Sequence, residues 1–131
     1  MRHALVLASL ITGAALLVGG CADQRAGQPV DTTNRFLTAL ADGDTTAACQ
    51  LLAPTTSQSL TSDGEPCGDA LAVLALPTEP ARDASVWSDR AQVHSDGDTL
   101  FLVDLADGWR IAAAGCTRAE EDTYDCALES G

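Results

Sequence analysis

Two aspartates in the second half of the chain are the residues best placed for acid–base chemistry. Asp89 and Asp104 lie in β-type stretches, and the turn signal Asp96-Gly97 between them aligns them across neighbouring strands. Carboxylates side by side on an apolar face repel each other, which favours one protonated carboxyl able to act as a general acid or base. The alternative is that both lie near strand ends, where solvent and nearby arginines neutralise them.

The rest of the chain offers little further catalytic chemistry. His94 is the only histidine after residue 20, and it stands beside a predicted turn, where we expect solvent exposure. The sequence contains no phosphate-binding glycine loop and no nucleophile elbow. The acidic stretches 95–98 and 119–125 carry oxygen ligands but lack the spacing of a calcium loop. We therefore expect no metal and no cofactor, and a non-enzymatic role is favoured over an enzymatic one.

Cys21 is a candidate for lipid attachment. A basic start at residues 1–3 precedes the uncharged apolar stretch 4–18, which is shorter than the roughly 20 residues of a membrane span. The exit Val18-Gly19-Gly20-Cys21 resembles the bacterial lipobox, in which a peptidase cuts before a cysteine whose thiol is lipidated. The resemblance implies a protein anchored on the extracytoplasmic face of the cell membrane through Cys21. The alternative is ordinary secretion, with Cys21 as an unpaired thiol.

The other four cysteines form an even set, which in an exported chain indicates disulfides. They are Cys49, Cys67, Cys116 and Cys126. Of the three possible pairings, Cys49–Cys67 with Cys116–Cys126 closes the shortest loops and costs the least entropy. A zinc site is the rival interpretation, but no pair has CxxC spacing and one histidine remains.

The elements that position these residues change character along the chain. Residues 1–20 are expected to be a signal peptide, residues 21–30 a lipidated cysteine and flexible tether, and residues 31–131 one domain. Its first half predicts helices: one capped by Asp31 or Thr32, one capped by Asp44 and ended by Pro54, and one beginning at Pro66. One helical turn is also expected around residues 57–60.

The second half predicts an antiparallel meander of four strands, at residues 85–94, 98–106, 109–116 and 124–129. Two-residue turns at Asp96-Gly97 and Asp107-Gly108 place Ala91 opposite Leu102, and Leu102 opposite Ala113. One face, expected to pack on the helices, then carries Trp87, Asp89, Ala91, Val93, Leu100, Leu102, Asp104, Trp109, Ile111 and Ala113. The central strands are apolar on both faces, so the second face needs a loop, another subunit or a partner to cover it.

The stretches "FLTALADGDTTAACQLLAP" and "GDTLFLVDLADGWRIAAAGCTRAEEDTYDC" resemble those of small actinobacterial lipoproteins of the nuclear transport factor 2-like (SnoaL-like) superfamily. The resemblance covers residues 31–129. It implies an α+β fold in which helices pack on a curved, cone-like sheet that can hold a ligand. Some members are isomerases, dehydratases or cyclases. The candidates for lining such a pocket are Trp87, Leu102, Trp109 and Ile111, although large aromatic residues in strands more often belong to the core.

The net charge of the chain limits the kinds of partner that it can bind. The net charge is −12, and every basic residue is arginine. Such a chain disfavours nucleic-acid binding, because phosphates are repelled. We expect a lipid-anchored binding or interaction module whose partner is a second copy, another envelope protein or a small apolar ligand. The alternatives are a small acid–base enzyme using Asp89 and Asp104, or a structural component of the envelope.

Overall fold

The first helix begins earlier than the sequence pattern predicts. The computed structural model describes residues 21–131, with side chains from residue 25 onward, so the signal-peptide prediction lies outside the described residues. Helix α1 (Cys21–Ala41) includes the segment expected to be a flexible tether and continues through Pro29. Proline inside a helix removes a hydrogen bond and costs stability. The Pro29 ring is buried and Val30 packs on the core, and this burial offsets the cost.

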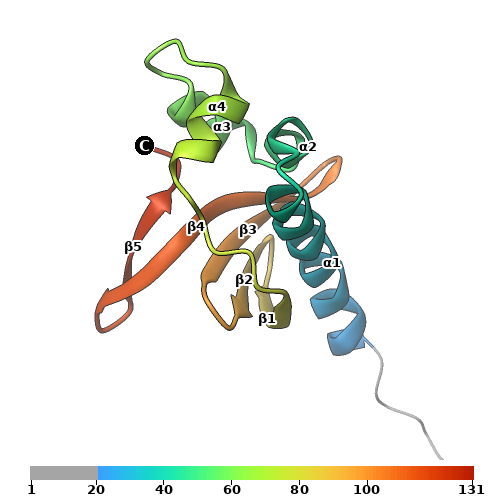
Figure 1. The fold of residues 1–131 in the computed structure, drawn as a ribbon. Coiled ribbons are helices and arrows are strands. Elements are labelled where there is room, and N and C mark those ends of the chain that lie inside the picture. Colours follow the sequence, from blue (N-terminus) through green and yellow to red (C-terminus); the bar gives the residue numbers. More distant parts are fainter. Residues whose placement is uncertain (1–20) are drawn as a thin grey trace, which may run out of the picture.

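Three short helices follow α1 and gather at one end of the sheet, as Figure 1 shows. They are α2 (Thr45–Gln50), α3 (Pro54–Leu60) and α4 (Cys67–Val73). The predicted cap of α2 is confirmed, because the Asp44 carboxylate accepts a backbone N–H three residues on, at 3.0 Å. Proline begins α3 and immediately precedes α4, positions where its missing N–H leaves no helical hydrogen bond unmade.

Two disulfides join these elements with the predicted connectivity. Cys49–Cys67 links α2 to α4, with Cα atoms 6.2 Å apart. Cys116–Cys126 closes the last hairpin, with Cα atoms 3.9 Å apart. Helices α2 and α4 are too short to be stable alone, and the Cys49–Cys67 disulfide holds them together.

The sheet has five antiparallel strands rather than the four that the sequence predicts, in the order β1-β2-β3-β4-β5. They are β1 (Ala81–Trp87), β2 (Arg90–Ser95), β3 (Thr99–Leu105), β4 (Gly108–Glu120) and β5 (Thr123–Leu128). The predicted first strand, residues 85–94, is in fact a hairpin that turns at Ser88 and Asp89. Ser88 adopts a left-handed conformation with a φ of 54°. Glycine usually occupies such a position, so the sequence carries no clear signal for this turn.

The predicted register is correct for one strand pair and wrong for the next. Ala91 lies opposite Leu102 and Val93 opposite Leu100, as expected. Between β3 and β4, however, Leu102 lies opposite Ile111 rather than Ala113. The turn consists of residues 106–107 instead of 107–108, which shifts the pairing by two residues. A shift of two keeps Trp109 and Ile111 on their predicted face, but the slip between Leu102 and Phe101 places Ala113 opposite Phe101, so the predicted position of Ala113 on the face of Leu102 is wrong.

Strand β4 is irregular further along, and a buried carboxylate holds the irregularity in place. The register slips between Leu102 and Phe101 and again between Phe101 and Thr99. Near the second slip Gly115 has a φ of 65°, typical of glycine at a β-bulge. The Asp98 carboxylate accepts the backbone N–H groups of Gly115 and Cys116, both at 2.8 Å. Asp98 therefore fixes the turn before β3 against the bulge in β4.

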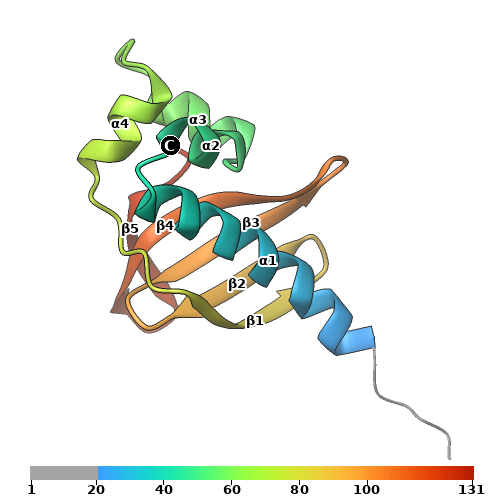
Figure 2. The same ribbon diagram turned by 45° about the vertical axis from the view of Figure 1, so that its right-hand side comes forward.

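The core lies between α1 and one face of the sheet, which we call the inner face; Figure 2 shows α1 crossing it. The buried side chains that form it come from α1, α2, α4, the segment between α2 and α3, and strands β2 to β5: Phe36, Leu37, Ala48, Leu51, Leu52, Leu71, Ala91, Val93, Leu100, Leu102, Trp109, Ile111, Ala114 and Leu128. An isolated bridge between Leu52 and Ile111 ties the loop after α2 to β4.

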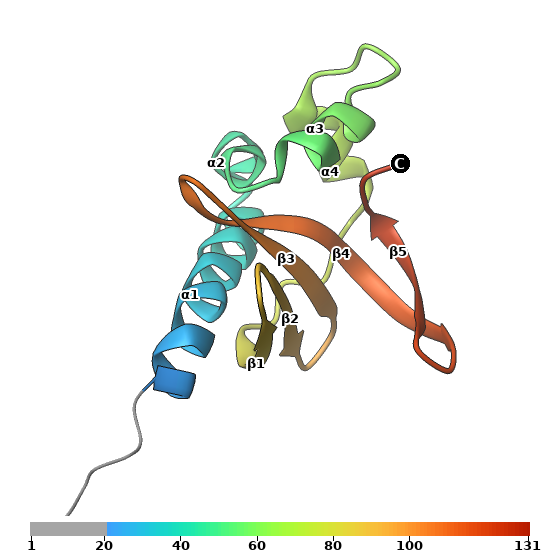
Figure 3. The ribbon, with the colours of Figure 1, turned by 180° about the vertical axis from the view of Figure 1, so that it is seen from behind.

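The opposite, outer face is partly covered by the chain itself. Figure 3 shows β4 and β5 from this side, with the end of their hairpin projecting from the sheet. Tyr124 on β5 lies edge-to-face with Phe101, with ring centroids 5.1 Å apart. Its hydroxyl accepts the Gln92 side-chain N–H at 3.0 Å. The β4–β5 hairpin thus covers part of the apolar surface for which a partner was expected.

Candidate functional site

The two aspartates proposed for acid–base chemistry are neighbours, but they are exposed. The backbone N–H of Asp104 donates to the carbonyl of Asp89 at 2.8 Å, which confirms the predicted cross-strand proximity. Both residues are exposed, and the Asp89 carboxylate lies 4.0 Å from the Arg90 guanidinium. The apolar enclosure that the acid–base hypothesis requires is not formed around them. The structure therefore removes the premise of that hypothesis.

The four pocket candidates do not come together around a cavity. Leu102, Trp109 and Ile111 are closed inside the core, with exposed fractions of 1%, 6% and 0%. The prediction that Trp87 shares their face is wrong, because Trp87 pairs with Arg90 on the outer face and is 49% exposed. The missed turn at Ser88 and Asp89 explains the error: a hairpin there reverses the chain, so the parity assumed along a single strand does not apply.

His94 stands on the outer face between two strands. Its Nδ1 lies 3.3 Å from the hydroxyl of Thr99, the residue that pairs with it on β3. On its other side the register places Asp83 of β1, a neighbour that the four-strand prediction did not include. No hydrogen bond between His94 and Asp83 occurs among the described residues, where the imidazole contacts Thr99 through its Nδ1.

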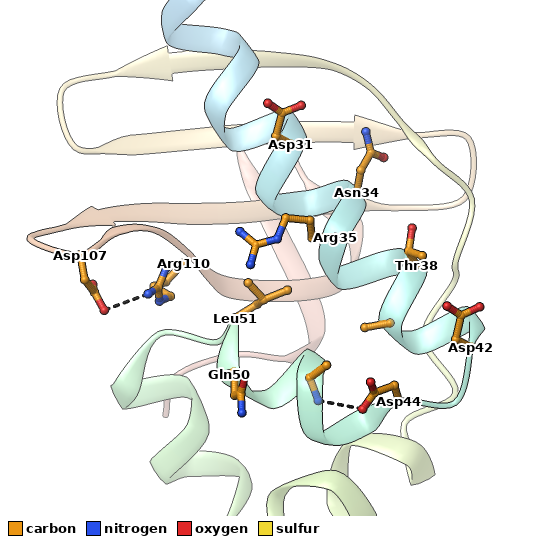
Figure 4. Close-up of a pocket in the computed structure, with 12 residues that line it drawn as sticks. Asp31, Asn34, Arg35, Thr38, Asp42, Asp44, Gln50, Leu51, Asp107 and Arg110 are labelled. Carbon is orange, nitrogen blue, oxygen red and sulfur yellow. Dashed lines mark hydrogen bonds and ion pairs between the residues drawn. The ribbon is translucent and has the colours of Figure 1, made fainter.

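A polar groove lies away from His94, between α1, α2 and the β3–β4 turn. Figure 4 shows its lining residues, and its volume is about 1070 Å³. One side is formed by α1 residues spaced three or four apart, on one face of the helix. The lining residues are Asp31, Asn34, Arg35, Thr38, Ala39, Asp42, Asp44, Ala47, Gln50, Leu51, Asp107 and Arg110.

The two guanidinium groups of the groove differ in their contacts. Arg110 donates to the Asp107 carboxylate at 2.8 Å and to the Trp109 carbonyl at 2.9 Å, so it is fixed against the turn. Arg35 projects from the exposed side of α1 and makes no ion pair within the described part of the chain. Arg35 is thus the basic group of this groove that can bind an anionic group without first breaking an ion pair.

The acidic groups of the groove also differ. Asp44 is engaged in capping α2, and Asp107 in binding Arg110. Asp31 and Asp42 are exposed at opposite ends of the α1 face. Within residues 25–131, no three His, Cys, Asp or Glu side chains are grouped so as to hold a metal ion. The groove is therefore suited to hydrogen bonding and charge pairing with a polar ligand.

Sequence reasoning missed this groove because it followed the apolar side of α1. The signal was present in the same helix: Asp31, Arg35, Thr38 and Asp42 recur at helical spacing opposite Phe36 and Leu37. A polar stripe of that kind usually faces solvent. Only the approach of α2 and the β3–β4 turn converts it into one wall of a groove.

Cys21 is the first residue of α1, while the rest of the predicted export signal lies outside the described residues. Each helix within residues 21–131 is too short or too polar to span a bilayer. Comparison of the chain with protein-family models, with curated proteins and with solved structures finds no match.

Proposed function

We propose that this protein is an exported, lipid-anchored bacterial envelope lipoprotein whose domain binds a polar ligand in the groove between α1 and α2. The observation that carries the binding role is the groove itself, in which the Arg35 guanidinium makes no ion pair with any side chain of residues 25–131. The export pattern before Cys21 supports the proposed location on the extracytoplasmic face of the cell membrane. The two disulfides agree with it, since such bonds persist mainly outside the cytosol.

The lining indicates the chemistry of the ligand. Arg35 provides a site for a carboxylate or phosphate, while Asp31 and Asp42 on the same helix face provide acceptors for cationic or N–H groups. A ligand bearing both kinds of group, such as an exposed peptide segment, matches this arrangement. The small apolar ligand considered from the sequence is less suitable, because its expected pocket residues are packed in the core.

The fold assignment belongs to the same proposal. Helices that precede an antiparallel meander, with α1 lying across one face, support membership of the nuclear transport factor 2-like superfamily with its cone-like domain. In this chain the space between α1 and the sheet is filled by side chains such as Phe36 and Trp109. We therefore place the binding site outside the cone.

We favour binding over catalysis because of the residues that line the groove. Its lining contains neither histidine, cysteine nor serine, the usual nucleophiles and proton carriers. Its carboxylates either cap a helix, pair with arginine or face solvent. A binding module needs only the complementary charges that these residues provide.

The binding role is tested by filling the groove. Thr38 is exposed on α1 within the groove, and Thr55 is exposed on α3 outside it. Wild type, Thr38→Arg and Thr55→Arg are extracted from membranes, and native mass spectrometry measures the bound species. We expect wild type and Thr55→Arg to retain the same ligand or partner and Thr38→Arg to lose it. Equal retention by all three would place binding elsewhere.

The address is tested independently with the full chain expressed in a bacterial host. Mass spectrometry of the membrane fraction should find a mature chain that begins at a lipidated Cys21. Cys21→Ser should carry no lipid, and a chain of mature length should be absent from its membrane fraction. A wild-type protein that is soluble, or cut at another position, would contradict the lipid anchor.

A further inference from the structure

We infer that Trp87 and the N-terminal turn of α1 form a membrane-contacting edge, in which the Trp87 indole lies in the headgroup region of the bilayer that anchors Cys21. This inference rests on the proposed lipid anchor and extends it from a tether to an orientation. The occupant of the edge is a phospholipid surface.

The position of Trp87 relative to the anchor is the first argument. The Arg25 guanidinium donates to the Ser88 carbonyl at 3.3 Å, so the start of α1 contacts the β1–β2 turn directly after Trp87. Cys21 precedes Arg25 by four residues, which is about 6 Å along a helix axis. Figure 2 shows the N-terminal turns of α1 beside this turn. A lipid on Cys21 therefore brings the β1–β2 turn to the bilayer surface.

The exposure of Trp87 is the second argument. The large hydrophobic residues exposed in the described chain are Trp87, at 49%, and Val73, at 81%. By contrast, Trp109 is 6% exposed and Phe36 is fully buried. Tryptophan prefers the bilayer interface, where its ring contacts acyl chains and its N–H stays hydrated. The exposed indole directly precedes the turn that contacts the start of α1, which is a position where a bilayer can stabilise it.

The charge distribution allows the same orientation. Arg25 and Arg90 flank the β1–β2 turn, and the exposed carboxylates of Asp89 and Asp104 balance their charge, so this edge carries little net charge. The acidic β4–β5 turn projects on the opposite side of the molecule from the start of α1 (Figures 1 and 3). A chain of net charge −12 can therefore approach a bilayer with this edge while its most acidic hairpin points away. A second contact also adds to the membrane affinity that the lipid provides, because buried apolar area contributes to binding.

The test uses the full chain, processed and lipidated in a bacterial host and reconstituted into phospholipid vesicles. Half of the preparations contain phospholipid brominated near the headgroup, which quenches indole fluorescence at short range. Three proteins are compared: wild type, Trp87→Phe, and the double variant Trp87→Phe with Val73→Trp. The last one moves an exposed tryptophan to α4, at the far end of the molecule from the start of α1. Near-ultraviolet circular dichroism checks that all three are folded.

We expect the wild type to lose the emission of one of its two tryptophans on brominated vesicles. Trp87→Phe should lose none, because Trp109 is in the core, and the double variant should also lose none. Quenching in both the wild type and the double variant would show that the domain has no fixed orientation on the bilayer. No quenching in the wild type would show that Trp87 does not contact lipid, whether it faces water or another protein. Either result overturns the inference while leaving the anchor intact. An unlipidated Cys21, seen by mass spectrometry, would instead overturn the anchor and the inference together.

Discussion

Two threonine hydroxyls with the same burial have different hydrogen-bonding states. Thr56 on α3 is fully buried, and its hydroxyl donates to the Ala112 carbonyl at 2.8 Å, which fastens α3 to β4. Thr33 on α1 is equally buried, and its hydroxyl oxygen has no partner among the described residues. A buried hydroxyl without a partner costs free energy, whereas a paired one contributes modestly.

Replacing each threonine by valine should therefore have opposite effects. Thr56→Val removes the hydrogen bond to the Ala112 carbonyl and should lower the free energy of unfolding by about 1–2 kcal/mol. Thr33→Val removes an unpaired group at nearly constant shape and should leave stability unchanged or raise it by up to about 1 kcal/mol. Urea unfolding under non-reducing conditions measures both. Equal losses in the two variants would mean that the Thr33 hydroxyl has a hydrogen-bond partner.

Asp98 is a residue whose charge depends on its surroundings. Burial raises the pKa of its carboxyl above the ordinary value, an effect only partly offset by the backbone N–H groups of Gly115, Cys116 and Thr99. The pKa of Asp98 is higher in the folded than in the unfolded protein. The contribution of Asp98 protonation to the free energy of unfolding is therefore fully present below the unfolded pKa. It is lost as pH rises through the folded pKa.

The pH dependence of Asp98→Asn tests this directly. The free energy of unfolding of wild type minus that of the variant should decrease as pH rises from about 3 to about 6. Urea titrations at each pH provide the measurement. Asp63→Asn, at an exposed aspartate between α3 and α4 that makes no ion pair within residues 25–131, serves as the baseline. A difference that grows with pH would mean that hydrogen bonding to the carboxylate outweighs its burial.

At the scale of elements, β4 determines the shape of the sheet. It is the longest strand, from Gly108 to Glu120, and it pairs with β3 on one side and β5 on the other. Its bulge at Gly115 allows the first half to pack under α1 while the second half forms the disulfide-closed hairpin. The bulge depends on glycine, because a Cβ there would lie 2.8 Å from the Leu76 side chain and 3.0 Å from the Cβ of Ala127.

Alanine at Gly115 should accordingly cost more than alanine at Gly43. Both glycines have positive φ, 65° and 71°, but a Cβ at Gly43 meets no atom within 4 Å. Gly43→Ala should cost only the backbone strain, about 1 kcal/mol. Gly115→Ala adds the steric clash and should cost about 2–4 kcal/mol. Thermal and urea unfolding compare the two, and equal losses would show that Leu76 moves aside freely.

At the scale of the whole molecule, charge repulsion opposes folding. The net charge is −12, and the three ion pairs of the described residues each involve at least one largely exposed side chain. Exposed pairs contribute little, about 0–1 kcal/mol each. Salt therefore has more unfavourable interaction to screen than favourable interaction to weaken.

Raising the ionic strength should stabilise the protein. A gain of about 1 kcal/mol corresponds to a rise in Tm of roughly 4–8 °C for a domain of this size. Calorimetry in low and moderate sodium chloride measures it, and potassium chloride should have the same effect if the cause is screening. A fall in Tm on adding salt would show that the ion pairs matter more than the repulsion.

The sequence by itself determined the features that depend on local chemistry. These include the α+β class, the Asp44 cap, the disulfide pairing and the β2–β3 register, since capping, short loop closure and Asp-Gly turns act over a few residues. Tertiary structure alone decided the rest. The helix through Pro29 depends on burial, the β1–β2 turn on a strained Ser88, and the groove on the approach of α2 to a polar face of α1. The buried helix and the groove arise from contacts between segments far apart in the chain, and the turn lacks the glycine that usually marks a left-handed position.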